Sequence, residues 1–297
     1  MKKITNLIFI IISLLLLVSC SAARVGDVFL VGVSDGLSDD AISAAISETF
    51  SAQFSANEFR DQSVSQTAQI TVMGETYTGQ YKYSDRGLRS ARIRDNYEDD
   101  EGNAFAITRE NGRLSYFDKF LVHDETSPIA CTIDEGKGIA VSFLETITDI
   151  ENYTMTSMTE ITDFAGSVIL GYRYSFTRFI NGIETNDKIY INVDSRRAVV
   201  CKYISYSVGE FAGVTLPDGF NLSASLEKIS AQTSEIWASA HTASVADASG
   251  EPSFAVATDS CRLVMTGDGR LALCAGINVS RENTPIKELM EMLIIIK

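Results

Sequence analysis

Residues 168–194 read VILGYRYSFTRFINGIETNDKIYINVD, a run dominated by β-branched and aromatic residues. Ile189, Ile191 and Val193 alternate there with polar or aromatic neighbours, which is the period of two expected of a strand. Residues 153–162 and 199–208 on either side have the same character. The sequence therefore predicts a four-stranded meander in this part of the chain.

A helix is expected directly before this meander. Thr132 and Glu135 have the spacing of a capping box, in which two side chains satisfy backbone N–H groups of the first turn. An apolar face follows at helical spacing, made of Ile139, Ala140, Phe143, Leu144 and Ile147. Gly136 and Gly138 are expected to weaken its first turn by roughly 1 kcal/mol each relative to alanine.

Other elements are expected on both sides of the meander. Hydrophobic periodicity predicts helices over about 39–57 and 219–239 and hairpins over 69–83, 105–117 and 261–279. The hairpin at 105–117 has Asn111-Gly112 at its centre, a pair that suits the two positive φ angles of a type I′ turn. The last apolar run, 293–296, is expected to be a buried strand, since it is too short for a membrane anchor.

The first twenty residues predict an address. Lys2 and Lys3 precede an apolar run from Leu7 to Val18, which is shorter than the roughly 20 residues of a membrane span. The following Leu17-Val18-Ser19-Cys20 resembles the cleavage box of bacterial lipoproteins. That resemblance implies cleavage between Ser19 and Cys20, lipid attached to Cys20, and a place on the extracytoplasmic face of a cell membrane. An ordinary secretory signal that ends in cysteine is the alternative.

The charge composition of the chain excludes some classes of binding partner. The chain has 25 Lys and Arg against 39 Asp and Glu, a formal net charge of −14. Removal of residues 1–19, which include Lys2 and Lys3, leaves 278 residues with a formal net charge of 23 − 39 = −16. So acidic a chain argues against binding to nucleic acid or to anionic lipid headgroups.

Five cysteines and two histidines limit the chemistry. Cys131, Cys201, Cys261 and Cys274 remain once Cys20 is acylated, and no CxxC motif occurs. A zinc site would have to be assembled from distant parts of the chain, so no metal site is expected. Cys261 and Cys274 flank the last hairpin, where a disulfide between them and buried thiols on strands are the two interpretations.

No catalytic motif is present. The chain lacks Gly-x-Ser-x-Gly, GxGxxG and GxxxxGK[ST], and two histidines leave little room for a triad. Pairs of carboxylates occur in any chain with 39 acidic residues, so they do not support a hydrolase. We therefore expect no enzyme, no catalytic residue and no cofactor.

The middle of the chain also carries a family pattern. The expected helix is followed by Tyr172-x-Tyr174-x-Phe176-x-Arg178, then by Asn181-Gly182-Ile183 and by Ile189-x-Ile191-x-Val193-Asp194. Over about 130–208 this resembles the PepSY-like domains of peptidase propeptides and of sporulation-associated envelope proteins. Arg196-Arg197 stands where that family usually has a glycine turn. Fainter echoes occur at 104–120 and 261–279.

The resemblance implies an α+β fold of antiparallel β-sheets, each packed on a helix, in PepSY-like or cystatin-like units. It also implies a non-catalytic role in binding a peptide or inhibiting a peptidase. Tyr172, Tyr174 and Phe176 share one strand face that ends at Arg178, so these four residues are candidates for a peptide groove. The alternative, which the residue types favour, is a core face with an arginine at its end.

Together these patterns predict five segments and a function. The segments are a signal peptide (1–19), a tether (20–37), an N-terminal α+β region (38–125), a PepSY-like domain (126–215), and a C-terminal helix with a β-hairpin (216–297). The last segment either forms a separate region or continues the sheet of the preceding domain. The expected function is that of a lipid-anchored binding protein whose partner is an envelope protein or peptide; a carrier of an apolar ligand is the alternative.

Overall fold

The computed structural model describes residues 28–30, 58–86, 92–121, 127–148, 150–206, 211–240, 252–265, 269–281 and 288–296. The chain divides into two compact units. The first comprises Met1–Val31, Ser223–Ser260 and Ala275–Leu293. The second comprises Gly32–Leu222, Cys261–Cys274 and Ile294–Lys297.

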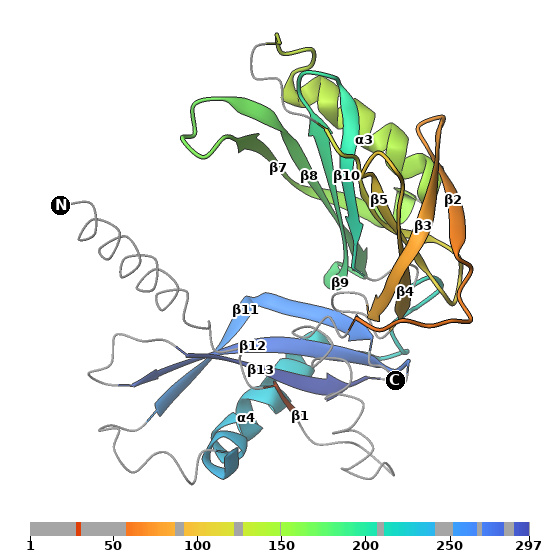
Figure 1. Ribbon diagram of the computed structural model, residues 1–297. Coiled ribbons are helices and arrows are strands. Elements are labelled where there is room, and N and C mark those ends of the chain that lie inside the picture. Colours follow the sequence, from red (N-terminus) through yellow and green to blue (C-terminus); the bar gives the residue numbers. More distant parts are fainter. Residues whose placement is uncertain are drawn as a thin grey trace, which may run out of the picture. The chain divides into compact units, whose positions relative to one another are not determined.

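The second unit is built on a long antiparallel sheet (Figure 1). Its hydrogen-bonded order is β2-β3-β4-β5-β6-β10-β9-β8-β7, so two meanders are joined where β6 meets β10. The strands are β2 (Thr67–Val72), β3 (Glu75–Arg86), β4 (Ile93–Glu98), β5 (Ala104–Thr108), β6 (Leu114–Asp118), β7 (Tyr153–Thr162), β8 (Ile169–Ile180), β9 (Ile183–Asp194) and β10 (Val199–Ser205). The predicted four-stranded meander is confirmed as β7 to β10.

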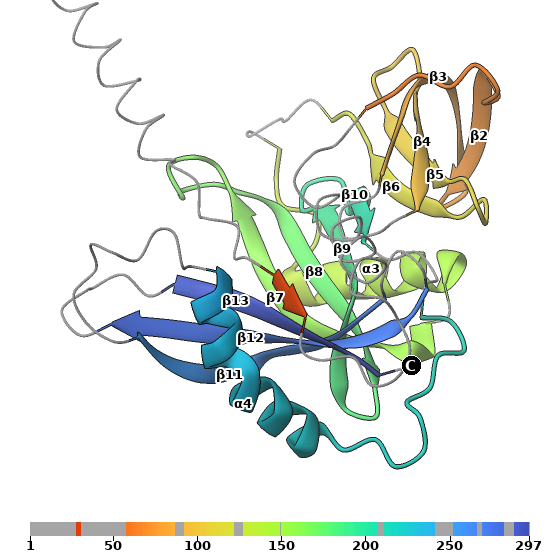
Figure 2. The ribbon, with the colours of Figure 1, turned by 90° about the horizontal axis from the view of Figure 1, so that it is seen from below.

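The first unit contains a smaller sheet and a helix. The strand order is β1-β13-β12-β11, with β1 (Val28–Leu30) parallel to β13 (Glu288–Ile295). The helix α4 (Leu222–Ala240) lies across one face of β11 (Pro252–Met265), β12 (Leu271–Arg281) and β13 in both views (Figures 1 and 2). Ile229 of α4 and Leu293 of β13 are fully buried, and the predicted C-terminal strand is confirmed.

The predicted fold class is wrong. The chain is mostly β: strands make up 53% of the described part, all thirteen belong to one hydrogen-bonded order, and the two α-helices of this part are α3 (Ile133–Ile147) and α4. The β-sheets are not separate helix-backed units. Strand β6 of the predicted N-terminal region pairs with β10 of the predicted PepSY-like domain, with Tyr203 opposite Phe117. Each meander would otherwise leave an edge strand with unpaired backbone groups at this place, and pairing the two edges removes both.

A parallel pair extends this order. Within the second unit, Leu263 of β11 pairs with Thr185 of β9, beyond the part of β9 that pairs with β10. The order is therefore mixed, whereas we expected antiparallel pairs throughout. The predicted boundaries of the five segments stay a prediction.

The helix α3 (Ile133–Ile147) covers one face of β8, β9 and β10. Its predicted capping box is confirmed: the Thr132 hydroxyl accepts from the Glu135 N–H group, and the Glu135 carboxylate accepts from the Thr132 N–H group. Ala140, Phe143 and Leu144 are fully buried against the sheet. The ring of Phe143 lies 5.4 Å from that of Tyr203 on β10, edge to face, an arrangement that aromatic pairs favour.

Gly136 is required by the packing of this helix. A Cβ atom at Gly136 would collide with the hydroxyl group of Tyr174, whereas a Cβ at Gly138 would meet nothing within 4 Å. The two glycines, which the sequence treats alike, therefore have different roles.

The turns correct one prediction. β5 and β6 form the expected hairpin, but Gly112 has a positive φ and Asn111 does not, so the turn is not type I′. Five residues separate the two strands, and the Gly112 N–H group bonds back to the carbonyl of Thr108. Two positive φ angles in succession occur instead at Asn181-Gly182 between β8 and β9, and at Met73-Gly74 between β2 and β3.

Several expectations fall on residues outside the described ranges. These are the signal peptide (1–19), Ser19 and Cys20, and the helix over about 39–57; the tether (20–37) is described only at β1. Among the described residues no helix is long and apolar enough to cross a membrane.

Candidate functional site

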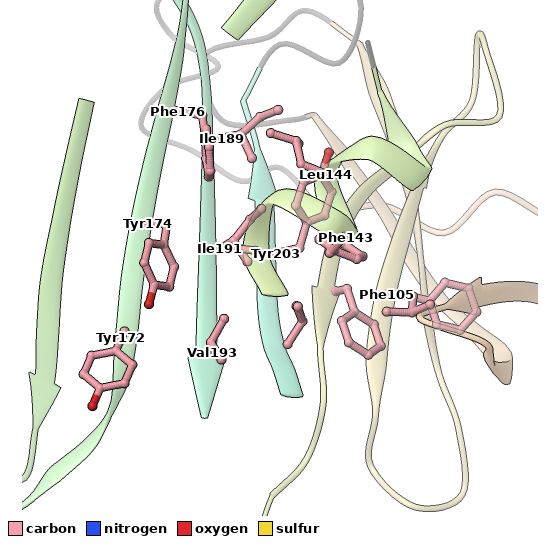
Figure 3. Packing of buried hydrophobic residues seen from close by; sticks show 14 of the residues in the cluster. Phe105, Phe143, Leu144, Tyr172, Tyr174, Phe176, Ile189, Ile191, Val193 and Tyr203 are labelled. Atoms are coloured by element: carbon pink, nitrogen blue, oxygen red, sulfur yellow. The ribbon is translucent and has the colours of Figure 1, made fainter. Parts of the chain in front are cut away.

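The predicted peptide groove lies in the hydrophobic core. Tyr172, Tyr174 and Phe176 of β8 belong to the buried cluster that includes Phe143 and Leu144 of α3 (Figure 3), and they are 4%, 0% and 2% exposed. The Tyr172 hydroxyl donates to the carbonyl of Cys131 at 3.1 Å, and the Tyr174 hydroxyl donates to that of Ile133 at 2.6 Å. These rings thus position the start of α3, as the core interpretation expects.

Arg178 is buried at the end of the same strand, in contact with two other strands. Its Nε donates to Oδ2 of Asp187 on β9 at 2.9 Å, and its guanidinium lies 4.7 Å from the ring centre of Tyr153 on β7. The Tyr153 hydroxyl donates to the same carboxylate oxygen at 2.8 Å. Burial raises the pKa of Asp187 even though Tyr153 and Arg178 act to lower it. The three side chains tie the first residue of β7 to β8 and β9.

A second polar network surrounds Arg109. Its Nη2 lies 2.6 Å from Oδ1 of Asp95, and its Nη1 lies 2.8 Å from Oδ2 of Asp61. The hydroxyl of Ser84 accepts from Arg109 and donates to Asp95. The Asp95 hydrogen bond raises the pKa of Arg109 further above its ordinary value. Because these groups satisfy one another, the network connects β3, β4 and β5 rather than presenting groups to a ligand.

The sheet face opposite α3 carries two rows of side chains in cross-strand register, and we call it the open face. The polar row consists of Arg173, Asn192, Lys202, Asp118, Ala104 and Glu98. The tyrosine row consists of Ser175, Tyr190, Ile204, Tyr116, Ala106 and Asn96, continued by Tyr83 on β3.

Three hollows lie on the open face. One, of about 290 Å³, is lined by residues that include Phe120, Leu170, Asn192 and Lys202. A second, of about 270 Å³, shares Asn192 and Lys202 with the first and adds Arg173, Tyr190, Ile204 and Tyr206. A third, of about 330 Å³, shares Ile204 with the second and includes Tyr83, Arg94, Asn96 and Tyr116. Since neighbouring hollows share walls, they form a continuous series.

Three basic side chains of the open face contact a carboxylate. Lys202 Nζ lies 2.7 Å from Asp118 Oδ2, Arg94 makes two bonds of 2.8 and 3.0 Å to Asp85, and Lys82 lies 3.5 Å from Glu98. Arg173 Nε donates to the Asn192 side chain at 3.1 Å. The face therefore offers fixed hydrogen-bonding groups: three of its cations are held by carboxylates, and Arg173 is held by an amide oxygen.

The strand β7 is an edge of this sheet. It pairs with β8 on one side only among the described strands, and seven of its ten residues are exposed. Register shifts interrupt its pairing between Met155 and Ser157 and between Ile161 and Thr162. The segment Ser157–Ile161 between them is regular and contains neither proline nor lysine; Glu160 and the two flanking irregularities are the features of β7 that protect a strand edge.

The cysteines do not form a reactive group in the described part of the chain. Burial raises the pKa of the Cys131 thiol and raises that of Cys201 to about 12, which keeps both protonated at neutral pH. Cys261 lies on β11 and Cys274 is buried on β12; the disulfide between them stays a prediction. No group of three or more metal-ligating side chains occurs among the described residues.

One part of the open face is visible in the sequence. In residues 188–193, Tyr190 and Asn192 alternate with the core residues Ile189 and Ile191, and they do lie on the opposite face. The sequence did not predict which side chains would lie beside Tyr190 and Asn192 on this face. Lys202 and Asp118, for example, are 84 residues apart and meet only because β6 pairs with β10.

Comparison with known proteins adds little. No protein-family model matches the chain, and no curated protein matches it. A solved structure, the Bacillus megaterium YpeB C-terminal domain, is similar over 87% of this chain and 99% of that chain, with 12% identity and a TM-score of 0.32. Two chains that share a fold usually have a higher TM-score than this. The similarity therefore supports no conclusion about the fold or function of this chain.

Proposed function

We propose that this chain is a non-catalytic binding protein of the cell envelope that takes up an extended peptide along β7. The observation that carries the proposal is the outer edge of β7, a strand of ten mostly exposed residues to which no second described strand is bonded. An extended peptide that adds a strand there gains backbone hydrogen bonds, and alternate side chains give it specificity.

The family resemblance of residues 130–208 and the lipoprotein box at Leu17–Cys20 supply the remaining parts of the proposal. A lipid on Cys20 would hold the acidic body at the extracytoplasmic face, where extended peptides and unfolded segments of secreted proteins occur. Metabolic labelling with a palmitate analogue should mark the wild type, and Cys20→Ala should be unlabelled and released from the membrane. An unlabelled wild type would refute this address.

The edge is tested by peptide selection. The purified chain is used to select from decapeptides displayed on phage, and the affinity of enriched peptides is measured by titration calorimetry. We expect Kd values of about 1–100 µM, since strand addition to a small edge buries a modest area. Enrichment no better than that of an uncoated surface would overturn the proposal.

Proline variants locate the binding. Met158 and Thr159 are neighbours in the regular part of β7, so one directs its N–H group toward β8 and the other away from it. Met158→Pro or Thr159→Pro at the outward position should weaken peptide binding at least tenfold with an unchanged melting temperature, because only the free N–H group is lost. Thr71→Pro, on the other edge strand β2, should leave the affinity unchanged. Equal affinities of the outward proline variant, of Thr71→Pro and of the wild type would refute strand addition at β7.

The alternative of an apolar carrier has weaker support. Of the three hollows, the one lined by Phe120, Leu121, Ile161 and Leu170 has the most apolar wall, and its volume of about 290 Å³ lies at the lower end of the roughly 300–1,000 Å³ usual for ligand pockets.

A further inference from the structure

We propose that the open face is a second binding site, for an uncharged oligosaccharide, independent of the peptide edge at β7. The proposal joins four tyrosine side chains, a row of hydrogen-bonding groups and three adjoining hollows on one face of the second unit.

The backbone of this face has little to offer a ligand. Strands β8, β9, β10 and β6 are each paired on both sides, so their N–H and C=O groups are used within the sheet. Recognition must therefore come from side chains. Extended peptides, which bind mainly through their backbone, are better served by the edge than by the face.

The side chains on the face suit a ligand with both apolar and hydroxyl-bearing surfaces. Tyr190 and Tyr206 line the middle hollow as an edge-to-face pair with ring centres 5.4 Å apart, and Tyr83 and Tyr116 line the third. A pyranose ring has C–H faces that pack on aromatic rings and hydroxyl groups at its rim that donate and accept hydrogen bonds. Arg173, Asn192 and Asp118 stand beside the tyrosine row and provide both donors and acceptors.

The charge balance decides between classes of oligosaccharide. Lys202, Arg94 and Lys82 are held by Asp118, Asp85 and Glu98, four of these six within 3.0 Å of their partners. At these three positions an anionic sugar would have to displace a carboxylate, at the cost of an existing ion pair, while a further cation, Arg173, is held by the side chain of Asn192. A neutral sugar uses the remaining hydrogen-bonding capacity of the same groups without breaking a pair.

The hollows set the size of the ligand. Volumes of about 290, 270 and 330 Å³ that share walls fit successive units of a chain better than a single ring. The lining runs from β8 to β3, seven strands whose six gaps of about 4.8 Å span about 29 Å. A linear oligosaccharide of several units is therefore the ligand that the face fits.

The test is titration calorimetry of the full purified chain with three tetrasaccharides. Tetra-N-acetylchitotetraose and cellotetraose are neutral, and tetragalacturonate is anionic. We expect at least one neutral probe to bind with a Kd of about 1 mM or tighter, and tetragalacturonate to bind at least about tenfold more weakly. No heat from either neutral probe at about 10 mM, or stronger binding of tetragalacturonate, would overturn the proposal.

Variants place the ligand. Tyr190→Ala should weaken binding of the neutral probe about tenfold by removing the ring, and Tyr190→Phe should stay within about twofold. Arg173→Ala, at an exposed position, is the second variant if Tyr190→Ala does not fold, and should also weaken binding. Phe164→Ala, fully exposed in the β7–β8 turn, is the matched control and should bind as the wild type does.

The proline variants of β7 separate this site from the peptide edge. They should keep the affinity for the neutral probe, whether or not the chain binds peptides. Loss of sugar binding in the outward proline variant, an unchanged affinity in Tyr190→Ala and Arg173→Ala, or competition by a selected decapeptide would refute a glycan site on the open face.

Discussion

At the scale of single residues, the buried contact of Arg178, Asp187 and Tyr153 has the largest consequence. Asp187 is fully buried, and its Oδ2 atom receives hydrogen bonds from both Arg178 and Tyr153. Removing one member of such a group leaves the other charge without compensation in a medium of low polarity, which costs more than the group contributes as a whole.

Arg178→Leu should therefore lower the free energy of unfolding by about 3–5 kcal/mol, measured by urea denaturation. The double variant Arg178→Leu/Asp187→Leu should recover most of this loss, since it removes both charges. A double variant as unstable as the single one would show that the contact acts through packing alone.

The titration of Asp187 gives a pH prediction. Its pKa is raised above the ordinary value of 3.8, so the folded chain holds this proton more tightly than the unfolded chain. This contribution to stability is complete below pH 3.8 and is lost as the pH rises through the raised pKa.

Asp187→Asn cannot lose that proton, so its stability relative to the wild type should rise with pH from about 4 upward, by at most about 1.4 kcal/mol per unit. Denaturation curves of both proteins at several pH values measure this difference in stability. The contributions of the other carboxyl groups are common to both proteins and drop out of the difference. A wild type that gains on the variant as the pH rises would mean that Arg178 lowers the pKa of Asp187.

At the scale of elements, short-range sequence patterns predicted individual helices and strands well. They did not predict which distant strands pair. The capping box of α3, the meander β7–β10 and the C-terminal strand follow from spacing within ten to twenty residues. The pairing of β6 with β10 and the parallel pairing of β9 with β11 do not follow from such spacing. The sequence of an edge strand does not specify which distant strand will pair with it. The error in fold class arose there, and so did the failure to foresee the open face.

The two glycines of α3 provide a matched pair. Gly138→Ala should stabilise the protein by about 0.5–1 kcal/mol, because alanine favours the helix and the added Cβ meets no atom. Gly136→Ala should destabilise it by about 1–3 kcal/mol, because the Cβ displaces the hydroxyl group of Tyr174 from the start of the helix.

Thermal unfolding of both variants measures the contrast, and Gly136→Ala/Tyr174→Phe should regain part of the loss by removing the colliding oxygen. Equal shifts in Gly136→Ala and Gly138→Ala would contradict the close packing of α3 on β8.

At the scale of the whole molecule, the second unit separates its tasks by surface. One face of its sheet is closed by α3 and filled by the core, the opposite face carries the tyrosine and polar rows, and β7 leaves a strand edge unpaired among the described strands. Both proposed sites need a rigid sheet but no moving part.

Hydrogen–deuterium exchange of the full chain, with and without a selected decapeptide, tests the binding role of β7 most directly. Strand addition predicts slower exchange of amides in Tyr153–Thr162 at alternate positions, because the outward N–H groups become bonded to the peptide. Protection that appears elsewhere and leaves β7 unchanged would contradict the account.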